Sequence, residues 1–301
     1  MATVSVLCTR VRMEEKQILA ALAAAGVPAL PLHPSRLPLP VGPVPPGPSA
    51  SAADGVVVEA GVIVDRCQDR AVAAAVLPAL RSVGVTVLDA GVAATGNRLA
   101  IASTLAAAAV PRPKTVLACS EESALAALDD IGYPATLLPL APGSSEFALL
   151  DRDIAEAILE HRGVLGAKHD VVMLVQSGMP LLEERVTVLV VDGHAVGMTG
   201  AVKHASYPSR FAGIAIAAAS VLGAAIAGVE IALTAAGPVV WDVLPAPDFR
   251  NAVPYGHVSV AEAIAASAAR ALGNQPGFLA ASVEVPSRRG REVTDDVALT
   301  A

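Results

Sequence analysis

Residues 239–253 read V-V-W-D-V-L-P-A-P-D-F-R-N-A-V, and this stretch decides the fold. Its first residues are apolar and mostly β-branched, which predicts a buried strand, and Pro245 and Pro247 end that strand because proline has no amide hydrogen to give to a sheet. An acid, Asp242, therefore lies inside an apolar strand. A second acid, Glu230, lies upstream in another apolar run, G-V-E-I-A-L, so two neighbouring strands can each present one carboxylate to the same cleft.

Paired carboxylates on neighbouring strands are a common way to hold Mg²⁺ against a nucleotide phosphate. Glu230 and Asp242 are therefore the candidate metal ligands of this chain. The other interpretation is structural, since an acid at the edge of a half-buried hairpin needs no metal. The residue pattern by itself leaves both interpretations open.

Composition limits the possible functions. The chain has 301 residues, 54% hydrophobic and 16% charged, which is enough for a large core in two or three subdomains. Its formal net charge of −7 argues against a nucleic-acid partner, which requires a concentrated basic face.

The cysteines and the apolar segments indicate where the protein works. Cys8, Cys67 and Cys119 lack metal-ligand spacing and are odd in number, which favours a reducing cytoplasm. The charged segment after Leu7 argues against a signal peptide. The uncharged run over residues 211–229 is mostly alanine and glycine, so it predicts a buried helix leading into a strand, with no membrane span.

The first third of the chain alternates strands and helices, which predicts an open α/β layer. Strands are expected over residues 3–8, 55–64 and 85–88, and a further helix opens at Asn97 and Arg98. Residues 28–53 are rich in proline, serine and glycine, which predicts a long exposed loop.

Four segments together resemble ATP-grasp ligases of the LysX and RimK type. Residues 241–251, W-D-V-L-P-A-P-D-F-R-N, match the family's N-E-V-N-H-T-P-E-F-K-N, and residues 6–15 match its opening V-L-x-x-R-x-R-x-x-E. Residues 110–115, V-P-R-P-K-T, match its hinge into the central subdomain, and residues 151–166 match its D-R-x-x-A-E-A-x-L-E-H-x-x-V-L-G helix. The resemblance covers residues 1–272 and implies an α/β (α+β) chain with the ATP-grasp fold and an N-terminal open α/β, or pre-ATP-grasp, subdomain.

This resemblance also implies domain boundaries. Residues 1–110 form the N-terminal domain, and residues 111–272 form the ATP-grasp domain, with a central lid subdomain over about 111–178 and a C-terminal subdomain over about 179–272. Residues 273–301 have no periodicity and are expected to be a disordered tail.

An intact family member joins a carboxylate to an amine with ATP and Mg²⁺, through an acyl phosphate. The LysX type acts on a small acidic amino-group carrier protein, and we expect a homo-oligomer. The residues that take the family's site positions are Glu230 and Asp242 for the metal, Arg98, Gln176 and Ser144 for the nucleotide, and Arg185 and Arg210 for catalysis.

Several positions depart from the family's pattern. The lysine that grips the nucleotide phosphates is Leu138 here, the phosphate-covering flap is short and carries Glu146, and the metal-binding asparagine is Leu244. Losing one charged partner of a buried phosphate costs about 2 kcal/mol or more, or about 30-fold in affinity. Two functions follow: a ligase with impaired or lost catalysis, or a non-catalytic pseudoenzyme that binds a carrier protein or an intact ligase paralogue.

Overall fold

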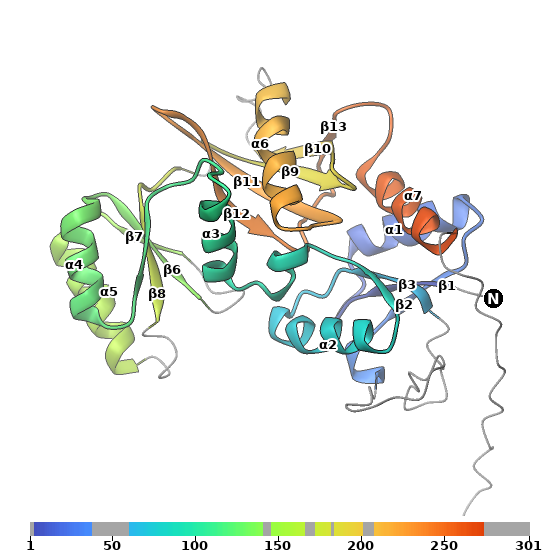
Figure 1. The fold of residues 1–301 in the computed structure, drawn as a ribbon, viewed down its shortest axis with the longest axis horizontal. Coiled ribbons are helices and arrows are strands. Elements are labelled where there is room, and N and C mark those ends of the chain that lie inside the picture. The colour runs from blue at the N-terminus through green and yellow to red at the C-terminus, as the bar shows by residue number, and fades with distance from the viewer. Residues whose placement is uncertain are drawn as a thin grey trace, which may run out of the picture.

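A computed structural model describes residues 3–37, 60–140, 146–165, 172–181, 184–200 and 208–273. These residues form three sheets with helices packed against them, which lie in Figure 1 as an N-terminal layer at the lower right, a C-terminal layer in the middle and a lid lobe at the left. Among the described residues, no helix combines the length and the apolar character that crossing a bilayer requires.

The N-terminal sheet is parallel, with strand order β2-β1-β3-β4, so the predicted open α/β layer is confirmed. Its elements are β1 (Thr3–Leu7), α1 (Met13–Ala24), β2 (Ala29–Leu32), the 3-10 turn η1 (Pro34–Arg36), β3 (Ala60–Asp65), α2 (Arg70–Ser82), β4 (Thr86–Leu88) and the 3-10 turn η2 (Gly91–Thr95).

The exposed loop predicted over residues 28–53 is wrong at its start, because β2 forms there and pairs with β1. Leu32 of β2 is buried, and Pro31 fits because β2 is the edge strand, where an amide hydrogen can be missing. The rest of the predicted loop, from residue 38, and the first part of the strand expected over 55–64 lie outside the described residues.

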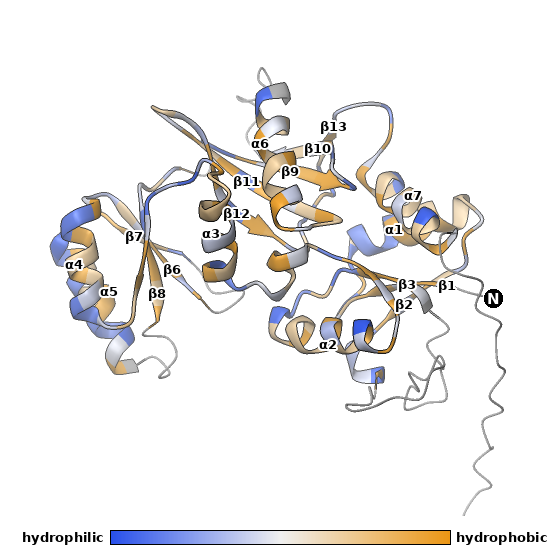
Figure 2. Cartoon of the chain, viewed as in Figure 1, coloured by the Kyte–Doolittle hydropathy of each residue, from blue (hydrophilic) through white to orange (hydrophobic). Residues whose placement is uncertain are grey.

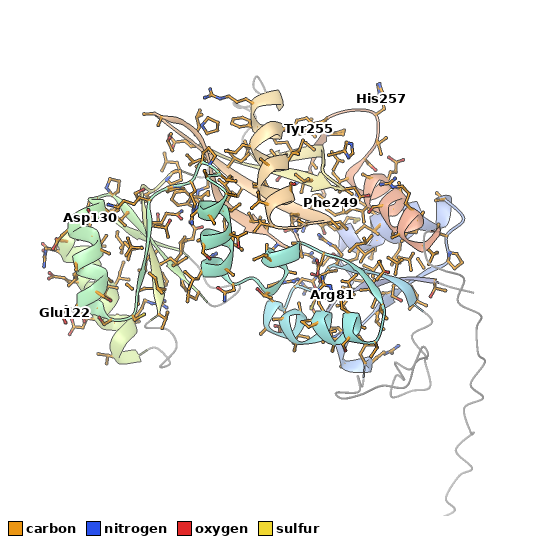
Figure 3. All side chains as sticks on the ribbon, viewed as in Figure 1. Arg81, Glu122, Asp130, Phe249, Tyr255 and His257 are labelled. Carbon is orange, nitrogen blue, oxygen red and sulfur yellow. The ribbon has the colours of Figure 1, made fainter. Side chains whose placement is uncertain are left out.

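The lid sheet is antiparallel, with strand order β5-β8-β6-β7. Its core, around Leu128, Leu137 and Val175, lies between the sheet and two helices whose outer surfaces are charged, as Glu122 and Asp130 show in Figure 3 and the blue colour shows in Figure 2. Its elements are β5 (Thr115–Ala118), α4 (Glu121–Ile131), β6 (Ala135–Pro139), β7 (Phe147–Leu149), α5 (Arg152–Leu165) and β8 (Met173–Ser177).

The C-terminal sheet is antiparallel, with strand order β12-β11-β9-β10-β13. The dipeptide Asp192-Gly193 predicts a two-residue hairpin turn, and both residues form that turn between β9 and β10 with positive φ. The elements are α3 (Arg98–Ala107), which leads toward the lid, then β9 (Arg185–Val191), β10 (His194–Gly200), α6 (Pro208–Val221), β11 (Ile226–Thr234), β12 (Gly237–Leu244), β13 (Val253–Pro254) and α7 (Val260–Gly273).

The two faces of the C-terminal sheet are buried differently. Val188, Val229 and Val240 pack toward α6, while Leu189 and Ile226 pack toward the other side. That second side shares one core with the N-terminal layer and with α7, which packs against α1. The sequence pattern did not predict α7, and through this helix the last described residues pack against the first helix of the chain.

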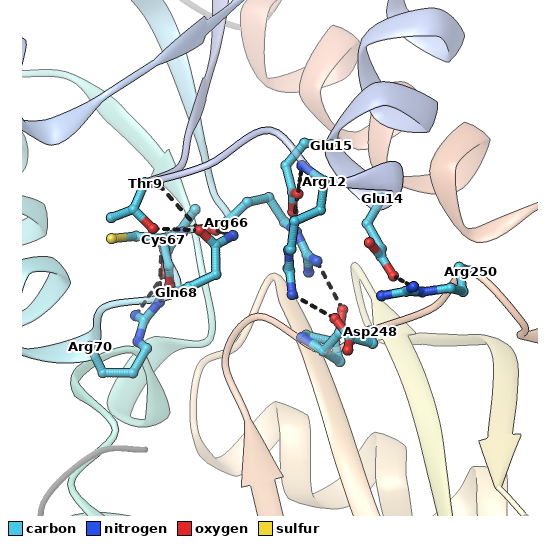
Figure 4. A network of polar contacts seen from close by, with 12 residues as sticks. Thr9, Arg12, Glu14, Glu15, Arg66, Cys67, Gln68, Arg70, Asp248 and Arg250 are labelled. Atoms are coloured by element: carbon cyan, nitrogen blue, oxygen red, sulfur yellow. Dashed lines mark hydrogen bonds and ion pairs between the residues drawn. The ribbon is translucent and has the colours of Figure 1, made fainter. Parts of the chain in front are cut away.

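A buried ionic network ties the N-terminal layer to the loop after β12 (Figure 4). The Arg66 side chain is fully buried, with its Nε 3.0 Å from Glu15 Oε1, and its Nη2 donates to the Pro247 carbonyl at 2.9 Å. Arg12 lies 3.1 Å from Glu15 and 2.6 Å from Asp248. Breaking such a buried ion pair typically costs about 3–5 kcal/mol, so the network holds the P-D-F-R-N loop in place.

The Glu15 carboxylate is ionised in this network. Burial alone would raise its pKa, but hydrogen bonds and charge attraction from Arg12 and Arg66 outweigh the burial and lower the pKa below the ordinary value. Ionised Glu15 therefore stabilises the fold at any pH above the ordinary glutamate pKa, and this contribution is lost as the pH falls through the lowered pKa.

The variant Glu15→Gln tests this linkage. This variant should have a lower free energy of unfolding near neutral pH, and that free energy should change less as the pH falls, because glutamine has no carboxylate to protonate. Urea midpoints followed by circular dichroism from about pH 7 to about pH 3 measure both effects. Glu156→Gln, which alters an exposed ion pair with Arg152, is the matched control and should follow the natural protein. An acid dependence of Glu15→Gln equal to that of the natural protein would contradict the assignment.

Candidate functional site

The two candidate metal ligands face each other across neighbouring strands. Glu230 of β11 pairs directly with Asp242 of β12, and the register shifts after Glu230, so that Trp241 is the extra residue of a β-bulge. Val240 and Val243 both pack toward α6, and the bulge turns the two residues between them, Trp241 and Asp242, to the opposite side. In a regular strand two consecutive side chains point to opposite faces, so the bulge brings both side chains to the cleft.

Arg98 binds the Asp242 carboxylate. The Asn97 side chain caps α3 and fixes Arg98 at its first turn, where the Arg98 Nε lies 3.0 Å from Asp242 Oδ2 and its Nη1 donates to the Pro139 carbonyl at 3.1 Å. Burial raises the pKa of Asp242, and the charge of Arg98 opposes that rise. Arg98, which the sequence predicts to hold phosphate, therefore neutralises Asp242, which the sequence predicts to hold metal.

Arg185 makes the corresponding contact with Glu230. Its Nη1 lies 3.4 Å from Glu230 Oε1 and 3.0 Å from Glu146 Oε2, and its guanidinium lies 4.7 Å from the centre of the Trp241 ring. The Trp241 Nε1 donates to Glu146 Oε1 at 3.3 Å. Burial raises the pKa of Glu230, Arg185 lowers it, and the nearby charges of Asp242 and Glu146 raise it further.

Glu146 is the site residue that sequence reasoning missed. The sequence placed this acid in the flap, where it would repel a phosphate, but it gave no sign of the contacts with Arg185 and Trp241. Glu146 lies 95 positions from Trp241 in the chain, so no local pattern could connect them.

An apolar contact fills the inner part of the cleft. Leu138 of β6 and Leu174 of β8 are buried against Ala102 of α3, which closes the lid sheet onto that helix. The remaining cavity, between Arg98, Arg112, Gln176, Asp242 and these apolar residues, has a volume of about 10 Å³. A cavity of that size holds about one water molecule.

A larger pocket, here called the hinge pocket, lies at the outer end of the cleft. Its volume is about 480 Å³, which is within the range of small-molecule sites. The lining residues come from the turn before β5, the segment after β8 and the β11–β12 hairpin: Arg112, Pro113, Ser177, Gly178, Met179, Pro180, Glu184, Leu233, Thr234, Ala236, Val239 and Trp241.

Comparison with solved structures identifies the fold. No family model matches the sequence. A RimK domain ATP-grasp protein from Sphaerobacter thermophilus DSM 20745 is 29% identical over 89% of this chain and 100% of its own, with a TM-score of 0.69. The chain has the ATP-grasp fold.

More distant ATP-grasp ligases share the same architecture. The ligase PsnB, solved with the precursor peptide PsnA2 and AMPPNP, is 17% identical over 90% of this chain and 97% of its own, with a TM-score of 0.66. A D-alanine-D-alanine ligase from Coxiella burnetii is 12% identical over 91% of this chain and 96% of its own, with a TM-score of 0.64. The structure is thus similar in fold to those of ATP-grasp ligases, and PsnB has also been solved with Mg and ADP.

The ATP-grasp cleft brings together four of the predicted site residues: Glu230, Asp242, Arg98 and Arg185. Gln176 lies at its inner end, fully buried, and its Oε1 accepts a hydrogen bond from Thr115. The roles of these residues remain predictions.

The other two predicted site residues are placed differently. Arg210 lies exposed in the first turn of α6, where its Nη2 would be 2.9 Å from a Cβ at Gly237, beside the β11–β12 turn. This position is away from the Glu230 and Asp242 carboxylates. Ser144 lies outside the described residues.

The donor set does not fit Mg²⁺ as it stands. Glu230 and Asp242 are each bound to an arginine, and Leu244 offers no oxygen where the family has an asparagine. Among the described residues, no group of three or more histidine, cysteine, aspartate or glutamate side chains is placed to hold a metal ion.

A double-mutant cycle tests the Arg98–Asp242 pair. Arg98→Met should lower the free energy of unfolding by about 3 kcal/mol, because it leaves the Asp242 charge buried without its cation. Arg98→Met combined with Asp242→Asn should recover a large part of that loss, since no uncompensated charge remains. Urea denaturation at neutral pH measures all four proteins. Strictly additive losses would show that the two side chains do not depend on each other.

Proposed function

We propose that the chain is a LysX- and RimK-like ATP-grasp protein in which ATP-dependent joining of a carboxylate to an amine is impaired or lost. One observation carries the proposal. Each carboxylate at a predicted metal position is neutralised by an arginine, Asp242 by Arg98 and Glu230 by Arg185. A divalent ion would have to displace both guanidinium groups and meet at most two carboxylates.

The phosphate side of the cleft supports the same proposal. Leu138 stands at the position of the phosphate-binding lysine, buried against Ala102 and Leu174, where it leaves neither charge nor room for a phosphate chain. Glu146 brings a negative charge to the same region. All of these changes weaken the binding of the same ligand, ATP, so restoring a single contact would not restore ATP binding.

A non-catalytic role accounts for a chain that keeps the ATP-grasp fold although the residues for ATP-dependent chemistry are altered. In this role the chain is a partner-binding module, and its partner is an acidic amino-group carrier protein or an intact ligase paralogue. The chain itself forms a homo-oligomer. The similarity over the full length of the RimK domain protein supports retention of the fold.

A divergent but active ligase is the second candidate. Glu230 and Asp242 still face each other on paired strands, and the hinge pocket is open. In that case ATP with Mg²⁺ would separate the arginines from the carboxylates, and Arg98 would turn to a phosphate.

Isothermal titration calorimetry with ATP distinguishes the two functions. The proposal expects that excess Mg²⁺ does not strengthen ATP binding relative to EDTA, and that Asp242→Asn changes ATP binding by less than about twofold. Asp153→Asn, an acid in the first turn of α5 on the lid's outer helices, is the matched control for the loss of one negative charge.

The contrary result is saturable, micromolar ATP binding that requires Mg²⁺, weakens in Asp242→Asn and is unchanged in Asp153→Asn. That result, together with phosphate release from ATP that depends on an added carboxylate and amine, would establish the divergent ligase and overturn the proposal.

A further inference from the structure

The lid lobe is attached to the rest of the chain at two places. The first is its hinge, where the chain enters the lid before β5 and leaves it after β8. The strand order β5-β8-β6-β7 places these two strands on one side of the lid sheet and β7 at the opposite edge. The second attachment is Glu146, which directly precedes β7 and contacts Arg185 and Trp241 of the C-terminal sheet. A contact at the edge opposite a hinge decides whether the lobe can swing.

Glu146 moves together with the lid lobe. It directly precedes Phe147, the first residue of β7, which pairs with Leu137 of β6. The centre of the Phe147 ring lies 5.1 Å from the guanidinium of Arg162 on α5, and Leu149 of β7 is fully buried in the lid core. The strand is held by both the sheet and a helix of the lid, so Glu146 leaves its partners only if the lobe itself moves.

Arg185 and Trp241 form a prearranged site for one carboxylate, here called the socket. Arg185 is fixed by its own partners, since its Nε donates to the Pro180 carbonyl at 3.2 Å and its guanidinium lies 4.7 Å from the centre of the Trp241 ring. Glu146 uses one oxygen for each member of the socket, with Oε2 3.0 Å from Arg185 Nη1 and Oε1 accepting from Trp241 Nε1 at 3.3 Å. Hydrogen bonds between charged groups are stronger than neutral ones, and a prearranged socket loses little entropy when it binds.

Glu146 is an anion that the chain supplies to its own cleft. Because it belongs to the same chain, its effective concentration at the socket is about millimolar or higher. Its side chain is 23% exposed and that of Arg185 is 12% exposed, so salt screens the pair only partly. The contact therefore needs no ligand, and an anion from solution has to displace Glu146 before it reaches Arg185.

We propose that Glu146 is a latch that keeps the lid closed on the C-terminal sheet in the absence of any ligand. While the latch holds, Leu138 and Leu174 of the lid stay packed against Ala102 of α3, and the inner cavity keeps its volume of about 10 Å³. When Glu146 is released, the lobe turns about its hinge and this apolar contact opens to water. The inference rests on the proposed function, because a cleft that its own side chains keep closed does not depend on ATP.

A buried thiol in the apolar contact reports how often the lid opens. The starting protein carries Leu174→Cys, which puts a thiol into that contact, and Cys119→Ser, which removes the exposed natural cysteine. The rate at which the new thiol reacts with N-ethylmaleimide, followed by mass spectrometry of peptides, is proportional to the open fraction when opening and closing are fast. Cys67, buried in the N-terminal layer, is the internal reference, because it reacts only when that layer opens.

Glu146→Ala should raise the labelling rate of the new thiol at least about tenfold, because it removes both contacts with the socket. The rate at Cys67 should stay within about twofold of the starting protein. Glu146→Gln, which keeps a hydrogen-bond acceptor without the charge, should give an intermediate rate. Glu156→Ala, which removes an acid from the outer surface of α5, is the matched control and should leave both rates within about twofold.

Two results would overturn the latch. An unchanged rate of the new thiol in Glu146→Ala would mean that the apolar contact alone holds the lid. Equal increases at the new thiol and at Cys67 would mean that the variant destabilises the whole chain instead of releasing the lid. Neither result affects the proposed function, which rests on the arginines that bind Glu230 and Asp242.

The same measurement with ATP and Mg²⁺ tests the proposed function separately. The proposed function expects no effect of ATP and Mg²⁺ on the labelling rate while Glu146 is present. A saturable effect at micromolar ATP would show that the nucleotide enters the cleft, and the proposed function would fail. A rate that rises about tenfold in Glu146→Ala without ATP would still support the latch.

Discussion

The pairing of β11 with β12, with its one extra residue at Trp241, is the constraint on which the cleft depends. A regular hairpin would turn either Trp241 or Asp242 toward α6, into the apolar core around Val240 and Val243. The bulge keeps that core intact and sends both side chains to the lid side. Everything else in the cleft is arranged around this pair, since Arg98 reaches Asp242 and Arg185 lies over Trp241.

Charge balance in this cleft comes from the protein's own side chains. Glu146, Glu230 and Asp242 bring three negative charges, and Arg98, Arg112 and Arg185 bring three positive ones, with Arg112 influenced by the charge of Asp242. A site built to hold divalent ions keeps an excess of carboxylates that the metal then balances. Here the balance is complete before any ligand arrives, which makes the cleft stable by itself and less receptive to an ion.

Sequence reasoning succeeded where the signal is local. The apolar run of β12, the two prolines that end it and the Asp192-Gly193 turn each act within a few residues, and each was found in the structure. The relative placement of Glu230 and Asp242 followed from two adjacent apolar runs. The α7 helix also has a local sequence signal, because Ser259 and Glu262 form the reciprocal hydrogen bonds of a helix start.

The sequence could not predict contacts between segments that are far apart in the chain. Arg98 and Asp242 are 144 positions apart, so the sequence could place each at a nucleotide site but could not show that they bind one another. The sequence did not indicate the bulge, because Trp241 is one more apolar residue in an apolar strand. β2 was hidden by its proline, which excludes a central strand and is harmless at an edge.

The position of α7 also affects the order in which the parts of the protein can fold. The core of the N-terminal layer, around Val6, Ile18 and Val64, includes Ile264 and Ala268 from the last helix of the described chain. A ribosome releases the chain from its N-terminus, so β1, α1 and β3 emerge long before the helix that covers them. The lid lobe has a core of its own and is complete once β8 has emerged. The core of the N-terminal layer is therefore complete only once α7 has been synthesised, whereas all residues of the lid core are available earlier.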